Sequence, residues 1–267
     1  MIKQNRRFNV SVIKTKEIII TKLFENHVRP PENYGYTGKR GQAKNKDKSI
    51  YSSMQRAKKK IFGYTIANNW DLWGTLTLDK IKINRYDLDL IQSKLNKYLQ
   101  NTKRRKYPNL AWLIVPEQHK DGAWHFHLLL NGLSFEELRD TKKTYKNTER
   151  KMYNWIDYEH KFGFNSFIDV STVSIEEKYK ISNYLTKYIT KAFCEARYNK
   201  KKYWSSKGLA EPNKFNTLLN YEEYKKALNI EYMHSNDIIY QSDYYVKDRT
   251  TGEIINKVKE ITRVLPF

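Results

Sequence analysis

Two histidines in one short apolar segment are the first residues of this sequence that could carry chemistry. His125 and His127 lie in AWHFHLLL, residues 123–130, whose composition predicts a β-strand. Because side chains alternate between the two faces of a strand, both imidazoles point to the same face, where they can bind one cation. Glu117 ends the preceding predicted strand, AWLIVPE, residues 111–117, and is a candidate third ligand.

The pairing register of this predicted hairpin decides whether the carboxylate reaches the histidines. A two-residue loop, Asp121-Gly122, would place Glu117 opposite Phe126 and its side chain on the wrong face. A three-residue loop that also includes Lys120, with its glycine in the left-handed conformation, would place Glu117 opposite His125. The second register predicts a Glu-His-His cluster.

Such a cluster of one carboxylate and two imidazoles has the ligand chemistry of a divalent metal site. Mixed oxygen and nitrogen ligands with open positions suit Mg²⁺ or Mn²⁺ acting on a phosphate, and three ligands could also hold zinc. His119 is a competing ligand, although it faces the expected loop.

A second candidate for chemistry is YLTKYITK, residues 184–191, which contains two tyrosines and two lysines. Ser174 followed by Glu177 resembles a capping box and predicts a helix that carries this segment. Spacings of three, four and seven residues place two phenols and two ammonium groups on one helical face. These residues are Tyr184, Lys187, Tyr188 and Lys191.

A phenol is a weak nucleophile near neutral pH because its reference pKa is about 10. Adjacent cations favour the phenolate, and a lysine can also hold a phosphate under attack. The segment therefore indicates a tyrosine nucleophile, and the alternative is a tyrosine stripe that packs on the sheet.

The remaining hydrophobic pattern predicts the elements that position these residues. We expect strands over 73–78, 111–117, 123–130 and 166–173, and helices over 49–66, 85–103, from 134 toward 159, and from 174 onward. This order implies an antiparallel sheet with helices on one face, the α+β class.

Composition and charge restrict the class of partner. The 267 residues include 50 Lys and Arg against 29 Asp and Glu, a formal net charge of +21, which calls for a polyanionic partner. Hydrophobic residues at 39% are sufficient for a folded core. The single cysteine, Cys194, excludes an internal disulfide and a cysteine-rich zinc site, and the longest early apolar run, Ile18–Ile20, is far too short to span a bilayer. We therefore expect a cytoplasmic protein without a membrane partner.

The positive charge is concentrated in clusters that alternate with tyrosine and tryptophan. This pattern suits single-stranded nucleic acid, because bases stack on aromatic rings while lysine and arginine contact phosphates. The candidate nucleic-acid-binding residues are Arg56, Lys58, Lys59, Lys60, Lys103, Arg104, Arg105, Lys106, Lys201 and Lys202.

Three motifs in this order resemble those of the rolling-circle replication initiators of the HUH endonuclease superfamily. WGTLTL, residues 73–78, resembles the first motif, HFHLLL resembles the His-hydrophobe-His motif, and YLTKYITK resembles the Tyr-x-x-Lys motif, present twice. Glu117 falls where related initiators carry an acidic metal ligand. The double tyrosine is similar to that of initiators from small single-stranded DNA phages, and YWSSKGLAEP, residues 203–212, resembles the segment after the tyrosine helix in phage and plasmid members.

The resemblance implies a five-stranded antiparallel sheet of the ferredoxin-like (RRM-like) type and a site-specific DNA nickase. Mg²⁺ or Mn²⁺ would be held by the Glu-His-His cluster, and either tyrosine would cut at an origin, leaving a 5′-phosphotyrosine and a free 3′-OH primer. The same chemistry would rejoin strands, and the sequence does not choose between the tyrosines. The implied partners are single-stranded or hairpin origin DNA and, since there is no NTP-binding motif, a separate host helicase and a DNA polymerase in a bacterial cytoplasm.

The resemblance also divides the chain. We expect a basic N-terminal extension with a flexible loop over residues 1–48, the endonuclease domain over 49–215, and a region of unknown role over 216–267. The extension should add phosphate contacts. Other readings remain: an HUH relaxase, although relaxases usually carry three histidines, a single-strand transposase, a non-catalytic single-stranded nucleic-acid-binding protein, and a zinc-dependent hydrolase.

Overall fold

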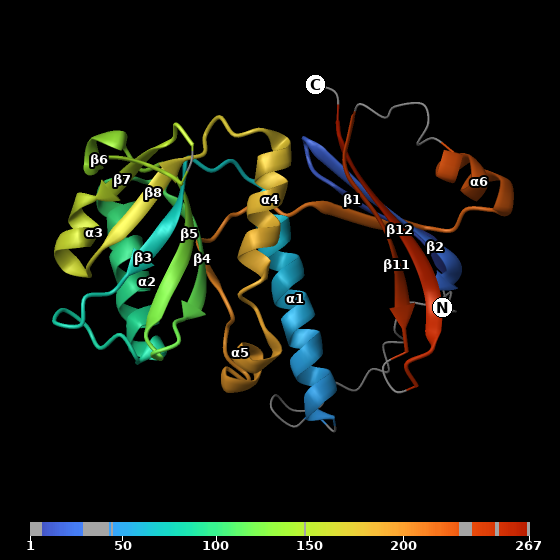
Figure 1. Ribbon diagram of the computed structural model, residues 1–267, viewed down its shortest axis with the longest axis horizontal. Coiled ribbons are helices and arrows are strands. Elements are labelled where there is room, and N and C mark those ends of the chain that lie inside the picture. Colours follow the sequence, from blue (N-terminus) through green and yellow to red (C-terminus); the bar gives the residue numbers. More distant parts are fainter. Residues whose placement is uncertain are drawn as a thin grey trace. The chain divides into compact units, whose positions relative to one another are not determined.

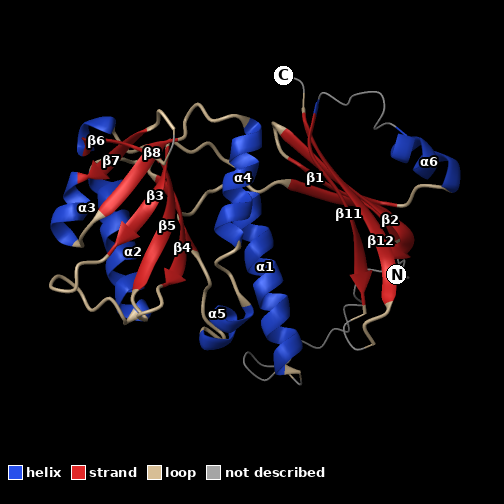
Figure 2. Cartoon of the chain, viewed as in Figure 1, coloured by secondary structure: helices blue, strands red, loops and turns tan. Residues whose placement is uncertain are grey.

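The chain forms two compact units, each built around its own antiparallel sheet (Figures 1 and 2). The computed structural model describes residues 7–28, 43, 45–146, 148–229, 237–248 and 251–265. One unit comprises Arg40–Ala210, and the other comprises Met1–Lys39 together with Glu211–Phe267. The predicted α+β class is confirmed. Among the described residues, no helix has the length and apolar character needed to cross a membrane.

The unit of residues 40–210 contains a seven-stranded sheet in the order β6-β7-β8-β3-β5-β4-β9. Its strands are β3 (Leu72–Thr77), β4 (Ala111–Gln118), β5 (Trp124–Asn131), β6 (Leu138–Thr144), β7 (Lys151–Trp155), β8 (Asn165–Asp169) and β9 (Trp204–Ser205). The four strands expected from the sequence are β3, β4, β5 and β8, which are consecutive neighbours in the middle of this sheet. The β6–β7 hairpin and the two-residue β9 extend it beyond the five strands expected.

The helix expected from residue 134 toward residue 159 is wrong. Ser134 does cap a turn, because its side chain accepts from the N–H of Glu136, but this turn is the short 3-10 helix Phe135–Glu137. The chain then forms β6 and β7, and only α3 (Ile156–Lys161) is helical. Pairing of β7 with the sheet edge at β8 overrides the local helix signal, which is a common outcome of tertiary contacts.

The other expected helices are present with small shifts at their ends. They are α1 (Lys46–Ala67), α2 (Leu88–Arg105) and α4 (Ile175–Thr186), followed by α5 (Lys191–Ala196). Helix α4 begins with the predicted capping box of Ser174 and Glu177.

Helices cover both faces of this sheet rather than the one face expected. Side chains of β4 and β5 alternate between two cores, as the strand repeat requires. One core joins α2 and α3 to Trp112, Ile114, Phe126 and Leu128. The other joins α1 and α4, which lie side by side in Figure 1, to Leu113, Val115 and Leu129. The strands β4 and β5 therefore carry apolar side chains on both faces.

The second unit is a five-stranded sheet made from both ends of the chain. Its order is β10-β1-β2-β12-β11, with helix α6 (Tyr221–Asn229) between β10 and β11 in sequence. The strands are β1 (Phe8–Lys14), β2 (Ile18–Val28), β10 (Asn213–Thr217), β11 (Ile238–Lys247) and β12 (Ile254–Val264). Val10, Val12, Leu23 and Ile261 form its buried cluster.

The compact units divide at residues 39/40 and 210/211, whereas the sequence analysis divided the chain at 48/49 and 215/216. The N-terminal extension and the C-terminal region contribute strands to one sheet, a long-range pairing that no local pattern indicates. Most of the expected loop over residues 30–48 lies outside the described residues, and its last three residues begin α1.

Gly74 allows β8 to approach the centre of the sheet closely. It lies on β3 opposite Phe167 of β8. A Cβ at this position would lie 2.1 Å from the carbonyl oxygen of Ser166 and 2.6 Å from Cδ1 of Phe167. The glycine in WGTLTL is therefore explained by packing.

We expect Gly74→Ala to destabilise the unit of residues 40–210 because the added methyl group meets backbone that cannot move aside. Overpacking costs about 1–3 kcal/mol or more, so the melting temperature should fall by at least about 2–4 °C. Thermal denaturation beside Ser93→Ala, on the exposed face of α2, measures the effect. Equal melting temperatures for both variants would contradict the packing argument.

Candidate active site

The hairpin of β4 and β5 adopts the register that places Glu117 opposite His125. The turn is closed by the N–H of His119, which donates to the carbonyl of Ala123 at 2.8 Å, and Gly122 has a φ of +86°. Both observations confirm the three-residue loop. The alternative register, with Glu117 opposite Phe126, does not occur.

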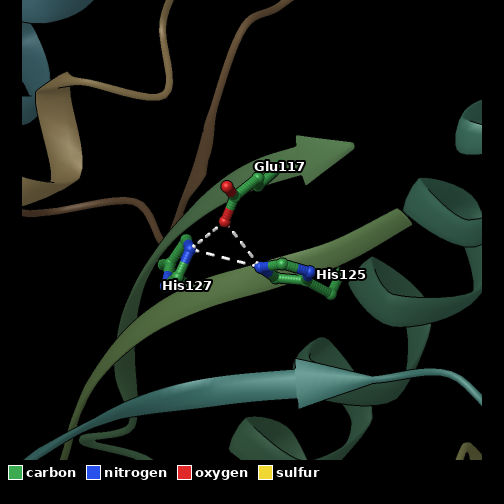
Figure 3. Close-up of side chains that lie close together, drawn as sticks. All are labelled: Glu117, His125 and His127. Carbon is green, nitrogen blue, oxygen red and sulfur yellow. Dashed lines mark hydrogen bonds and ion pairs between the residues drawn. The ribbon is translucent and has the colours of Figure 1, made fainter. Parts of the chain in front are cut away.

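This register brings three potential metal ligands together (Figure 3). Oε2 of Glu117 lies 2.7 Å from Nε2 of His125 and 2.7 Å from Nε2 of His127, and the two Nε2 atoms are 3.3 Å apart. All three ligand atoms lie within 4.8 Å of one another. The group is a possible binding site for a divalent metal, and its mixture of carboxylate and imidazole fits magnesium, manganese or zinc.

Burial keeps the imidazoles in the form that binds metal. His127 is only 3% exposed, and burial lowers its pKa to about 4. Burial, followed by the neighbouring His119, also lowers the pKa of His125. Because a metal ligand must be a neutral imidazole, both residues are prepared for coordination at neutral pH.

His119 lies behind the cluster rather than in it. Its Nε2 contacts Nδ1 of His125, whereas the other ring nitrogen of His125 faces Glu117. Second contacts of this kind orient metal-binding histidines. The competing role as a ligand is therefore not favoured by the geometry.

The expected single helix through YLTKYITK is interrupted. Helix α4 ends at Thr186, Tyr188 lies in the following turn, and α5 begins at Lys191. The side chain of Thr190 accepts from the N–H of Phe193 at 3.1 Å and so caps the new helix. Since serine and threonine favour such cap positions, the sequence held a signal for this break.

Despite the break, both phenols and one ammonium group gather at His127. The ring of Tyr188 stacks on the imidazole with centroids 4.1 Å apart, and the ring of Tyr184 approaches it edge-on at 5.5 Å. Nζ of Lys187 lies 3.7 Å from the ring centroid of Tyr184 and 4.8 Å from that of Tyr188. Lys191 does not join them, because its Nζ pairs with Asp47 at 3.2 Å.

The phenol of Tyr188 is not ionised by its surroundings. Burial raises its pKa, and a hydrogen bond with Tyr184 adds to this effect. The expectation that neighbouring cations favour the phenolate is therefore wrong for Tyr188 in the free protein, because loss of solvation outweighs the nearby ammonium group. Attack by this phenol requires a group that takes its proton or a cation that stabilises the phenolate.

The candidate nucleic-acid-binding residues fall in different places. Arg56, Lys58, Lys59 and Lys60 lie on α1, which packs on the same sheet face as Glu117 and the two histidines. Lys201 is exposed, whereas Lys202 is only 5% exposed and donates to the carbonyls of Arg197 and Lys200. Lys202 is therefore corrected to a residue that holds a turn and is not free to bind a phosphate.

The run from Lys103 to Lys106 is remote from the candidate active site. It ends α2, which covers the opposite sheet face, and Nζ of Lys103 donates to the carbonyl of Leu110 just before β4. Glu117 is near the other end of β4, about 20 Å away along the strand. This cluster cannot contact the same phosphate as the tyrosines.

Two aromatic residues at the site were missed by the sequence analysis. The ring of Trp73 lies 5.4 Å from that of Tyr184, and Tyr145 lies 5.9 Å from Trp73. Trp73 is two residues before Thr75, which pairs with His127, so its place on the same face of β3 was available from the strand repeat. Tyr145 had no such signal, because it follows a strand that was expected to be a helix.

Comparison with known proteins bears on the same segment. Residues 71–193 match the model of a family of replication-associated proteins of the ORF2 type. This match supports a replication initiator family. The matched residues include the three potential metal ligands and both tyrosines of the site. No match was found among curated proteins or among solved structures.

Metal binding at Glu117, His125 and His127 should stabilise the folded protein. At a metal concentration of about 100 times Kd, the gain is about 2.7 kcal/mol, or a rise of about 5–10 °C in melting temperature. We expect Mn²⁺ to produce this rise in the wild-type protein and in His160→Ala, whose imidazole is exposed on α3. His125→Ala should lose it, and an undiminished rise in that variant would place the metal elsewhere.

Proposed function

We propose that this protein initiates rolling-circle replication by nicking and rejoining single-stranded DNA at an origin. The observation that carries the proposal is the meeting of three potential metal ligands with two tyrosine phenols on one face of the sheet. The match to a replication-associated family over the same residues supports it. A site of this kind has the parts needed for covalent phosphoryl transfer.

In the proposed reaction, a tyrosine oxygen attacks the scissile phosphorus. A bond forms between the phenolic oxygen and phosphorus while the bond from phosphorus to the 3′-oxygen breaks. The phenol loses its proton, and the leaving 3′-oxygen gains one, so the products are a 5′-phosphotyrosine and a free 3′-OH primer. The reverse reaction rejoins the strand without an external energy source, because the phosphotyrosine retains a phosphodiester.

The protein groups have distinct proposed roles. Glu117, His125 and His127 hold Mg²⁺ or Mn²⁺, which when bound polarises the scissile phosphate. Lys187 neutralises negative charge as the phenol and phosphate approach each other. Lys191 acts elsewhere, since its ammonium group is bound to Asp47.

Two tyrosines allow two successive transfers. Tyr184 and Tyr188 both contact His127, and their rings are 5.3 Å apart. One phenol can therefore hold the 5′ end while the other attacks the regenerated origin after a round of synthesis. The single-stranded or hairpin DNA, a host helicase and a polymerase are the proposed partners, in a bacterial cytoplasm.

A covalent DNA adduct is the direct test. Labelled single-stranded oligonucleotides tiled across the genetic element that carries the gene are incubated with the full chain and Mn²⁺, and products are separated on a denaturing gel. We expect an adduct that chelator abolishes, that the Tyr184→Phe/Tyr188→Phe double variant cannot form, and that falls by at least about 100-fold in Glu117→Gln.

Peptide mass spectrometry of each single variant assigns the attacking tyrosine, and Tyr64→Phe on α1 is the control that should retain full activity. DNA that binds without becoming attached would support a non-catalytic binding protein instead. Metal-dependent cleavage that persists in the double variant would support a hydrolase that does not use tyrosine.

A further inference from the structure

A hollow of about 670 Å³ lies beside Tyr184 and is used by none of the roles proposed above. Its wall contains three aromatic side chains, Trp73, Tyr145 and Tyr184. Tyr184 is shared, because its ring also contacts the imidazole of His127. The hollow therefore begins where the candidate nucleophiles are.

The aromatic wall offers surfaces for stacking. Each of the three rings is half-buried, and the rings of Tyr145 and Tyr184 both meet Trp73 at steep angles, 65° and 77°. The indole Nε1 of Trp73 is buried and has no hydrogen-bond partner within the described part of the chain. An indole N–H is a donor that an acceptor on a ligand can satisfy.

The rim of the hollow is cationic on balance. Three cations, Lys146, Arg150 and Lys180, line it together with two carboxylates, Glu149 and Glu177. Arg150 donates to both carboxylate oxygens of Glu177 at 2.8 Å, which fixes its guanidinium group, while Lys146 is exposed with its Nζ 5.1 Å from the ring centroid of Tyr145.

We propose that this hollow binds one unpaired nucleobase of the DNA substrate, adjacent to the phosphate that the tyrosines attack. The base stacks against Trp73 and Tyr145, and the backbone follows the cationic rim. Aromatic rings combined with cations are the chemistry that recognises single-stranded nucleic acid. The proposal rests on the proposed function for the position of the scissile phosphate, but its base-stacking part is testable without any cleavage.

The test compares two probes of equal length and charge. One is a thymidine oligonucleotide of about 20 nucleotides, and the other is the same chain with abasic residues. Binding to the full chain is measured by fluorescence anisotropy with chelator present, so that no strand is cut. We expect Tyr145→Leu to weaken thymidine binding by about 5- to 150-fold and to leave abasic binding unchanged, while Tyr145→Phe restores the affinity.

Tyr153→Leu is the matched control, because Tyr153 belongs to the same β6–β7 hairpin but packs toward the opposite core. An equal loss for both probes in Tyr145→Leu would overturn the proposal, since the base would then play no part. Unchanged affinity for both would also overturn it and would fit a hollow that binds a protein side chain.

A measurement on the wild-type protein keeps the proposal open to refutation if Tyr145→Leu fails to fold. Thymidine in the same probe is replaced by 5-iododeoxyuridine, which crosslinks to nearby aromatic rings under ultraviolet light. Crosslinked peptides that contain Trp73 or Tyr145 are expected, and crosslinks confined to other peptides would refute the assignment. A missing tyrosine adduct together with these crosslinks would refute the nickase alone.

Discussion

The pairing register of β4 with β5 is the constraint on which the rest of the structure depends. It sets Glu117 opposite His125, and the same register assigns alternate residues of both strands to two different cores. A slip by one residue on either strand would move its polar ligand side chains into one core and exchange large side chains between the cores. The loop with Gly122 at positive φ fixes this register locally. Packing and the candidate metal site therefore reinforce the same choice.

Burial at the site has opposite consequences for its two kinds of residue. It keeps His127 neutral and able to bind a cation, but it also keeps the phenol of Tyr188 protonated. A divalent ion reverses the second effect, because a nearby positive charge favours the phenolate. In the proposed reaction, the protein is therefore inactive toward phosphate until metal and DNA are both present. Lys187 supplies a fixed positive charge beside both rings.

The parts of the site that depend on strand repeat and loop length could be predicted from the sequence, and those that depend on contacts between distant segments could not. The Glu-His-His cluster follows from counting across one short loop. Tyr145 belongs to a hairpin whose strand character comes from pairing with β8, so the signal at Ser134 was misleading. The end of α4 was predictable in principle, because Thr190 is a good cap, but the repeated Tyr-x-x-Lys pattern suggested a continuous helix.

The sheet made from both ends of the chain imposes an order on folding during synthesis. Strand β2 pairs with β12, whose residues are made more than 200 positions later, and β1 is flanked by β2 and β10. Residues 40–210 hold their own strands and helices and are complete before any of those partners has left the ribosome. The first two strands must therefore wait through the whole synthesis of the other unit. During that interval their edges are unpaired, which makes this segment a natural client for chaperones.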